Sequence, residues 1–368
     1  MHLQRLILSD FKNIREADLS FSSKMNCFLG NNGAGKTNLL DAIYYLSMTK
    51  SYFGQSDTQS ICFGSLLFSL SGYYLFEEAL QEHIVCVVEA GGSKNIQRNG
   101  KNYTRFSEHL GLLPLVVVSP SDTMLIHSPA EERRRFMNVL LSQMDSIYMS
   151  CLQQYNQVLA QRNHCLRQGY YRADLMEALE VQMGVKAAVI YEKRAQICNL
   201  LAPLIGKYYG ILSGHQEEIA LNYKSDLALR PLSVLLEESR QRDRLLHYST
   251  CGVHRDEVVF MMNGHPIRRF GSQGQQKSFL VALKLAQFEI MKQSRGEAPM
   301  LLLDDVFDKL DMDRVAHLLE LVVQPHFGQI FITDSNKSRI EGVVQELTDE
   351  HTFFNITGGI CKENKLSR

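Results

Sequence analysis

Gly30-Asn31-Asn32-Gly33-Ala34-Gly35-Lys36-Thr37 is the most informative run of residues in this chain. The run fits the pattern G-x-x-x-x-G-K-[ST], in which glycines let backbone N–H groups close around phosphates. Lys36 is then placed to reach the terminal phosphates, and Thr37 is placed to hold Mg²⁺. A flexible Gly/Asn turn is the alternative for the run alone, so its surroundings must decide.

The flanking residues favour a phosphate loop. Met25 to Leu29 is a short apolar strand pattern, and Asn38 to Met48 carries apolar residues at helical spacing. Phosphates in the loop would therefore face the N-terminus of a helix, where free N–H groups and the helix dipole attract anions. We expect the nucleotide to be bound by the whole run, namely Gly30, Asn31, Asn32, Gly33, Ala34, Gly35, Lys36 and Thr37, with Lys36 also catalytic.

An acidic pair ends the apolar run Met300-Leu301-Leu302-Leu303, almost a whole chain later. Such a run is typical of a strand buried on both faces, and acids at its carboxyl end lie where ligands bind in open α/β sheets. We assign Asp304 to Mg²⁺, through water, and Asp305 to polarising the water that attacks the γ-phosphate. Two solvated acids at a strand end are the alternative, which the phosphate loop disfavours.

A third segment, Ser272-Gln273-Gly274-Gln275-Gln276-Lys277, stands at the start of a helix expected from Gln275 to Lys292. A serine and a glycine at a helix start can offer a hydroxyl and free N–H groups to an anion. Ser272 is therefore a candidate catalytic and nucleotide-binding residue, and Gly274 and Gln275 are candidate nucleotide ligands. An ordinary serine N-cap is the alternative. The order of this segment, a helix and an apolar strand ending in Asp-Asp is that of the ABC-type ATPases.

The middle of the chain changes character and predicts a helical arm. Ser128-Pro129-Ala130-Glu131 is a capping-box pattern, after which one apolar stripe at helical spacing extends over roughly 35 residues. Further helices are expected from Ala173 to about Tyr209 and from Pro231 to about Tyr248, with a strand from Ile219 to Tyr223. Turn signals at Asn99-Gly100 and Asn263-Gly264 predict hairpins, the second with a strand from Pro266 to Phe270.

These patterns predict an α/β fold, an ABC-type P-loop ATPase head with a short helical arm inserted. We expect residues 1–127 to form the N-terminal part of the head, residues 128–250 the arm, and residues 251–368 the C-terminal part of the head. The helical patterns are far too short for the coiled coils of hundreds of residues found in SMC proteins.

The overall composition does not by itself indicate a function. The chain has 368 residues, is 45% hydrophobic and has a formal net charge of −1, so any polyanion would bind a local patch. The 8 cysteines are scattered without C-x-x-C spacing, which favours reduced thiols over zinc. Arg5, Asp10 and Lys12 interrupt any signal-peptide core, and no apolar run is long enough to span a membrane. We expect a cytoplasmic protein.

Several segments together resemble the RecF family of bacterial DNA repair and replication ATPases, which are related to SMC proteins. They are F-K-N-I, G-N-N-G-A-G-K-T-N-L-L-D-A-I-Y-Y-L-S, S-P-A-E-E-R-R-R-F, G-V-H-R-D-E, G-S-Q-G-Q-Q-K and L-L-L-D-D-V-F-D-K-L-D. The resemblance implies that two subunits sandwich ATP, with Ser272 of one facing the γ-phosphate held by Lys36 of the other. It also implies slow DNA-stimulated ATP hydrolysis and binding to single-stranded, gapped and duplex DNA. Cooperation with RecO and RecR, in recombinational repair and the SOS response, is implied as well.

Some positions depart from that family pattern. Lys277 stands where arginine is common, and Asp308 stands where a serine often begins the loop that crosses the dimer interface. Ser119 and Asp122 are the candidates for the place of the metal-sensing glutamine of transporter-type ATPases. His254-Arg255-Asp256 is expected to be structural or close to the nucleotide.

DNA contact must come from local basic clusters that neutralise backbone phosphates. The candidates are Arg133 to Arg135, the group Arg240, Arg242 and Arg244, the pair Arg268 and Arg269, and the hairpin residues Lys94, Arg98, Lys101 and Arg105. Two other functions stay open on the sequence. One is the nucleotide-binding subunit of a transporter, which the long insert between the phosphate loop and Ser272 opposes. The other is a non-catalytic DNA clamp switched by ATP.

Overall fold

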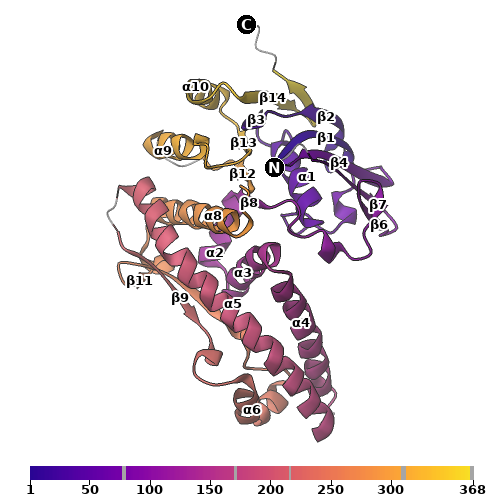
Figure 1. Ribbon diagram of the computed structural model, residues 1–368, viewed down its shortest axis with the longest axis vertical. Helices are drawn as coiled ribbons and strands as arrows, with labels where there is room; N and C mark the ends of the chain where they lie inside the picture. Colours follow the sequence, from indigo (N-terminus) through magenta and orange to yellow (C-terminus); the bar gives the residue numbers. More distant parts are fainter. Residues whose placement is uncertain (77–79, 170–171, 215–216, 308–311, 365–368) are drawn as a thin grey trace. The chain divides into compact units, whose positions relative to one another are not determined.

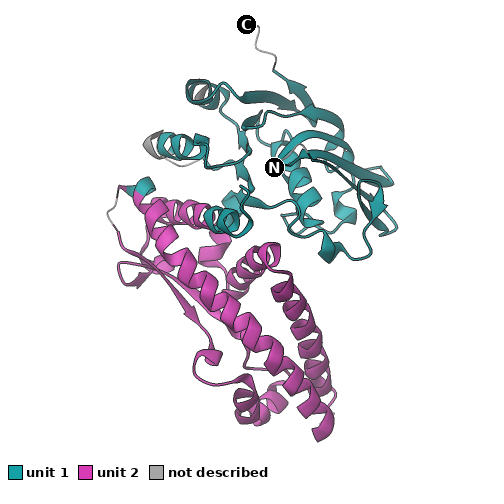
Figure 2. Ribbon diagram, in the orientation of Figure 1, with its two compact units in different colours: residues 1–122, 211–213, 287–368 teal, residues 123–210, 214–286 magenta. Residues whose placement is uncertain are grey.

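The chain divides into two compact units. The computed structural model describes residues 1–76, 80–169, 172–214, 217–307 and 312–364. Unit 1 comprises residues 1–122, 211–213 and 287–368, and unit 2 comprises residues 123–210 and 214–286 (Figure 2). Residues 251–286, which include the Ser272 segment, therefore group with the helical arm. The domain limits derived from the sequence differ here, because they assign this stretch to the head.

A mostly parallel six-stranded sheet organises unit 1, in the order β15-β14-β3-β13-β12-β8 (Figure 1). All its strand pairs are parallel except the one between β14 and β15. Every residue of β3, β13, β12 and β8 is buried, as expected for a parallel sheet covered on both faces. Their bounds are Met25–Leu29 (β3), Leu115–Val118 (β8), Met300–Asp304 (β12), Ile330–Asp334 (β13), His351–Thr357 (β14) and Ile360–Glu363 (β15).

Three helices and an aromatic cluster accompany this sheet. Phe21 meets the ring of Phe331 edge-on at 5.1 Å between centroids, and Phe28 and Phe354 pack beside them. Helix α10 packs on β14 and on α9. The bounds are Lys36–Met48 (α1), Met312–Val323 (α9) and Lys337–Leu347 (α10). Because β3, β13 and β12 lie side by side, their carboxyl ends bring the phosphate loop and the acidic pair to the same edge.

The second sheet of unit 1 is antiparallel, in the order β2-β1-β4-β5-β6-β7. One face alternates into the core, where Phe11, Tyr45 of α1 and Phe68 pack edge-to-face. The predicted turn at Asn99-Gly100 is confirmed, since Arg98 pairs with Lys101 across it. The strands are His2–Phe11 (β1), Ile14–Ser20 (β2), Leu67–Leu75 (β4), Gln81–Glu89 (β5), Lys94–Arg98 (β6) and Lys101–Asn102 (β7).

Unit 2 is built around an antiparallel pair of long helices, α4 (Ser146–Arg167) and α5 (Ala173–Ser213) (Figure 1). At one end of the pair Tyr148 contacts Arg194, and at the other end Arg162 contacts Glu180. The remaining elements are α2 (Thr123–His127), α3 (Ala130–Met144), α6 (Leu232–Leu246), α7 (Ile267–Phe270), the first part of α8 (Gln273–Arg295) and the antiparallel sheet β11-β10-β9. Its strands are Ile219–Lys224 (β9), Glu257–Met262 (β10) and His265–Pro266 (β11).

Buried arginines hold this arm together. Arg162 has an exposed fraction of 0% and donates to Glu180, Asp243 and Ser249. Breaking such a network by removing one partner leaves an uncompensated buried charge, which costs about 3–5 kcal/mol. The network therefore makes the arm a specified structure rather than a loose pair of helices.

Two expectations for this region are wrong. The single stripe after Ser128 is interrupted at Asp145, whose extended backbone ends α3 and whose carboxylate accepts the N–H groups of Ile147 and Tyr148 at the start of α4. The capping box at Ser128 does not form, because Pro129 occupies the N-cap of α3 and no side chain caps it. Apolar spacing continued across the break, so periodicity alone could not reveal it.

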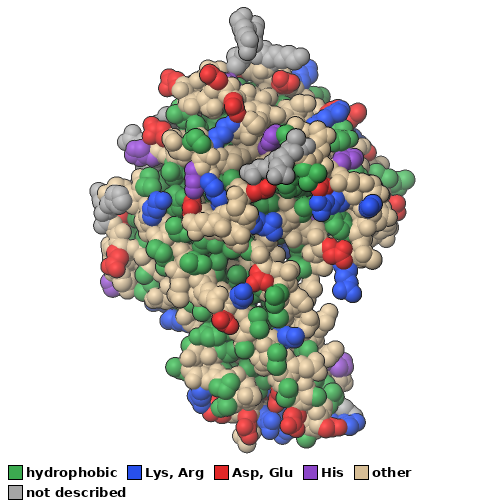
Figure 3. Space-filling view, viewed as in Figure 1, with side chains coloured by type: hydrophobic (Ala, Val, Ile, Leu, Met, Phe, Trp, Pro, Cys, Tyr) green, Lys and Arg blue, Asp and Glu red, His purple; other side chains and the backbone are tan. Residues whose placement is uncertain are grey.

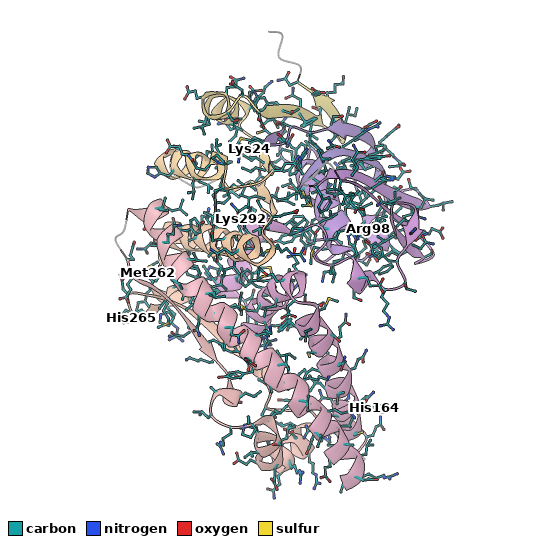
Figure 4. All side chains as sticks on the ribbon, viewed as in Figure 1. Lys24, Arg98, His164, Met262, His265 and Lys292 are labelled. Atoms are coloured by element: carbon teal, nitrogen blue, oxygen red, sulfur yellow. The ribbon has the colours of Figure 1, made fainter. Side chains whose placement is uncertain are left out.

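The second hairpin is confirmed but its outer strand is short. Met262 pairs with His265 across Asn263-Gly264 (Figure 4). The strand expected from Pro266 to Phe270 is wrong, since the helix α7 begins directly after Pro266. No helix among the described residues combines the length and apolar character needed to cross a membrane. No cluster of three or more His, Cys, Asp or Glu side chains able to hold a metal occurs in the same described ranges.

Candidate functional site

The phosphate loop joins the end of β3 to the start of α1, as the sequence predicts. Gly35 is the N-cap of α1 with φ 115°, in the left-handed region that favours glycine, and a Cβ there would lie 2.9 Å from Oδ1 of Asn13. Gly30 is equally constrained, because a Cβ would lie 2.2 Å from the carbonyl oxygen of Ile356. The loop is thus a close-packed turn whose N–H groups lie at a helix N-terminus.

Lys36 folds back over this loop. Its side chain is buried, and Nζ donates to the carbonyl oxygens of Gly30 at 2.8 Å and Asn31 at 3.2 Å. Neutral carbonyls are weaker partners for an ammonium than phosphate oxygens are. A phosphate entering the loop can therefore take over these hydrogen bonds, with the cation already in place.

Thr37 and Asp304 meet although 267 positions separate them. The Thr37 hydroxyl donates to Oδ1 of Asp304 at 2.8 Å, and the hydroxyl of Thr333 donates to the same oxygen at 2.8 Å. Burial raises the pKa of the Asp304 carboxyl, while both hydroxyls and the nearby Lys36 act in the opposite direction. Because both of these bonds fall on Oδ1, the lone pairs of Oδ2 and of the Thr37 hydroxyl are available to a cation or its water.

Asp305 takes an unusual backbone conformation just beyond the strand. Its φ is 44°, and its N–H donates to the Thr333 hydroxyl at 2.9 Å. A non-glycine residue in this region costs of order 1 kcal/mol, so surrounding contacts must hold it there. The kink turns the Asp305 side chain away from the direction that a continuing strand would give it.

Thr333 was missed from the sequence. It is wholly buried at the end of β13, and its one hydroxyl accepts from the Asp305 N–H and donates to Asp304. The apolar residues Ile330, Phe331 and Ile332 are typical of a buried strand, but nothing in a Thr at a strand end indicates that it serves a neighbouring strand. Only the parallel register that places Thr333 beside Asp304 shows the role.

Two supports of the phosphate loop were also missed. Asn13, in the turn between β1 and β2, donates to the Ala34 carbonyl oxygen at 3.3 Å and accepts from Asn38 at 2.7 Å. Gly359, in the turn between β14 and β15, donates its N–H to the same Ala34 oxygen at 2.9 Å. The sequence signal for Asn13 was the F-K-N-I run, which indicated a family but no contact.

The Ser272 segment lies in unit 2 and begins α8. Ser272 and Gln275 form a reciprocal capping box, with the Ser272 N–H donating to Gln275 Oε1 at 2.8 Å and the Gln275 N–H donating to Ser272 Oγ at 3.2 Å. Ser272 and Gln273 are exposed, whereas Gly274 and Gln275 are half-buried. The structure thus confirms the local N-cap, while the nucleotide contacts of Ser272, Gly274 and Gln275 stay predictions.

Other predicted positions have structural partners. Asp122 accepts from the Ser119 N–H at 2.8 Å and from the Tyr52 hydroxyl at 3.0 Å, so it holds a turn, and its metal-sensing role stays a prediction. Arg194 binds Asp256 at 2.8 Å, and Tyr155 bonds to His254, whose pKa burial lowers to about 4. Asp308 lies outside the described residues.

The basic clusters divide into paired and exposed members. Arg133 is buried against Glu257, Arg134 donates to the Asp256 carbonyl oxygen, and Arg135 lies near Glu132, so this cluster serves the fold of the arm. Three more have acidic partners: Lys94 with Asp57, Arg98 with Glu82, and Arg240 with Glu180. Arg135 and Arg240 are exposed although each has an acidic neighbour, and the other exposed cluster members are Lys101, Arg105, Arg242, Arg244, Arg268 and Arg269.

Comparisons with known proteins agree with this geometry. The family model "RecF/RecN/SMC N terminal domain" matches residues 2–350. The chain is 44% identical over 359 residues to the "DNA replication and repair protein RecF" of Parabacteroides distasonis, covering 98% of each chain. It is 43% identical to the protein of the same name from Porphyromonas gingivalis, covering 98% of this chain and 99% of that one.

Solved structures give the same result. The "recombination mediator protein RecF-ATP in RecFOR pathway" matches with a TM-score of 0.89 at 27% identity, covering 99% of this chain and 97% of that one. An Smc head domain from Pyrococcus furiosus shares the fold, with a TM-score of 0.60 at 18% identity and coverage of 100% and 96%. The comparisons give no support to a transporter subunit. The chain belongs to the RecF family of DNA replication and repair proteins.

Proposed function

We propose that this protein binds DNA under the control of ATP, dimerises around the nucleotide and hydrolyses it slowly, faster with DNA present. Its relatives are named for DNA replication and repair, and one solved relative is the "recombination mediator protein RecF-ATP in RecFOR pathway". In that role the protein supports loading by RecO and RecR at single-stranded, gapped or duplex sites, and contributes to the SOS response.

One observation carries the proposal: the hydroxyl of Thr37 contacts the carboxylate of Asp304 at 2.8 Å beside the phosphate loop. A hydroxyl next to a P-loop lysine, facing an acid at the carboxyl end of another strand of the same sheet, is the donor set that Mg²⁺ takes in P-loop proteins. Thr37 and Asp304 would hold the ion, whose charge neutralises the β- and γ-phosphate oxygens when it is bound.

Other residues of the chain bind the phosphates and orient the attacking water. Lys36 binds the terminal phosphates, and the loop N–H groups orient them at the start of α1. Asp305, held in its kinked conformation by Thr333, accepts a hydrogen bond from the attacking water and orients it. Ser272 is supplied by a second copy, which suits its exposed place at the start of α8.

The first test uses two disabled chains. In the Lys36→Met chain the nucleotide cradle is impaired, and in the Ser272→Arg chain the segment offered to the partner is impaired. Because each mixed dimer retains one intact composite site, a mixture should recover part of the ATPase activity that neither chain shows alone. Specific activity of the unmodified protein should rise with protein concentration. A flat concentration profile in dilute protein contradicts the dimer.

We expect DNA to bind a surface of mixed charge rather than a uniformly basic one. On the face drawn in Figure 3, lysine and arginine side chains are interspersed with acidic ones. The exposed arginines Arg242, Arg268 and Arg269 are the residues best placed to contact phosphates without first losing an ion pair. ATP-dependent retention on gapped, duplex and single-stranded DNA, measured against salt, tests this. Each lost phosphate contact should lower the slope of log affinity against log salt by about 1.

A further inference from the structure

We infer that Glu217 is a positioning residue for the Ser272 segment, acting through the side chain of Gln275. The inference deepens the proposed function, on which it rests, because Ser272 is the group offered to the partner's nucleotide. Glu217 lies outside every motif that the sequence indicates. It stands between the end of α5 and the start of β9, more than fifty positions before Ser272.

The contacts form a short relay. Oε1 of Glu217 accepts from Nε2 of Gln275 at 2.6 Å. Oε1 of the same Gln275 amide accepts from the Ser272 N–H at 2.8 Å, and the Gln275 N–H donates to Ser272 Oγ. A carboxylate can only accept here, so it fixes which end of the amide is the donor and turns the amide oxygen toward Ser272.

The relay has a consequence for the Ser272 hydroxyl. Its oxygen already accepts from the Gln275 N–H, so its own proton is the group left to donate. A phosphate oxygen from a second copy is an acceptor. Holding Gln275 in one orientation therefore presents Ser272 as a donor in a fixed direction, which lowers the ordering cost of engaging the partner.

Stability does not explain the arrangement. Among the described residues, Oε2 of Glu217 is buried and has no hydrogen-bond partner. A buried acceptor that receives no hydrogen bond lowers the stability of the fold. A carboxylate at this position is therefore poorly explained by a purely structural role. Residues that lower the stability of the fold while ordering a binding segment are typical of functional sites.

Glu217 also lies between α5, which ends at Ser213, and β9 (Ile219–Lys224), whose partner β10 precedes the Ser272 segment and α8. The hydrogen bond to Gln275 therefore joins the segment before β9 to the start of α8, and both lie in unit 2.

The test compares Glu217→Ala with Glu217→Gln in the full chain. The glutamine keeps an acceptor oxygen for Gln275, so its concentration-dependent ATPase should stay close to that of the unmodified protein. The alanine variant should lose about tenfold in that activity, as expected for one charge-assisted hydrogen bond. Its ATP affinity in dilute protein and its thermal midpoint should not fall. An alanine variant with full activity, or one whose loss follows a lower midpoint, overturns the inference.

A second experiment exchanges the amide and the carboxylate between positions 217 and 275. Gln275→Glu alone keeps the capping box but sets two carboxylates against each other, and should lower activity. Adding Glu217→Gln restores one amide facing one carboxylate, and activity should rise above that of Gln275→Glu alone. If the double variant is no more active than Gln275→Glu alone, charge near the phosphate rather than the relay is responsible, and the inference fails. Ser272→Arg is the reference: if it too leaves activity unchanged, the proposed function fails instead.

Discussion

The phosphate cradle of unit 1 and the Ser272 segment of unit 2 are built in opposite ways. Lys36, Asp304 and Thr333 of the cradle are buried, and several elements fix it at once, since Thr37, Asp304 and Thr333 meet around one carboxylate oxygen. Ser272 is exposed, and its place depends on a capping box and the single bond to Glu217. The phosphate cradle is thus fixed by contacts between several elements, whereas the Ser272 segment is fixed by two contacts made through Gln275.

The largest effect should come from the cradle. Lys36→Met removes a charged donor from a buried position, so ATP affinity of the single chain should fall by roughly 100-fold, as charged hydrogen bonds are worth about 1.5–3 kcal/mol each. Nucleotide titration in dilute protein measures this. Ser272→Arg is the matched control and should bind ATP normally. Equal losses in both variants would break the contrast between the two regions.

A second effect separates stability from turnover. Because burial raises the pKa of Asp304, its ionised form is disfavoured in the folded state. Its contribution to folding is therefore favourable at low pH and is lost as pH rises through the folded-state pKa. Asp304→Asn should raise the thermal midpoint at neutral pH, by about 2–4 °C for each kcal/mol relieved. Mg²⁺-dependent hydrolysis should fall by about 100-fold.

Thermal scans at several pH values provide the check on Asp304. The advantage of the Asn variant should shrink as the pH is lowered and the native carboxyl takes up its proton. A variant that is less stable than the unmodified chain at neutral pH would contradict the assigned direction of the shift.

A smaller effect is expected at Thr333. Thr333→Val keeps the shape of the side chain but removes the hydroxyl that joins Asp304 to the Asp305 N–H, so turnover should fall by about tenfold. Thr333→Ser keeps the hydroxyl and should retain most activity. ATPase rates across a Mg²⁺ series measure both. If valine and serine behave alike, the hydroxyl plays no part in ordering the acids.

The smallest effect is expected at Ser272, in the exposed segment of unit 2. Ser272→Ala removes the side-chain cap of α8 and should cost about 1 kcal/mol locally. Hydrogen exchange of the first α8 amides should speed up, while ATP binding to the dilute chain stays unchanged. Faster exchange in the phosphate loop of the same variant would show that the two regions are not independent.

Local chemistry explains which features the sequence predicts. The phosphate loop, the Asn99-Gly100 turn and the buried β12 strand each follow from a few adjacent residues, and the structure confirms them. The interruption at Asp145 was missed because apolar spacing continues through it. The roles of Thr333 and Asn13 depend on strand register and on a turn meeting a distant loop, which no short-range pattern encodes.

The position of β3 in its sheet has a consequence for synthesis. This early strand lies between β13 and β14, and Gly359 supports the loop that follows it. During synthesis, the nascent chain cannot complete the phosphate-binding site until nearly the whole polypeptide has emerged from the ribosome. We therefore expect nascent and truncated chains to bind nucleotide more weakly than the full chain, and the long sequence separation of these pairings predicts slow folding after release.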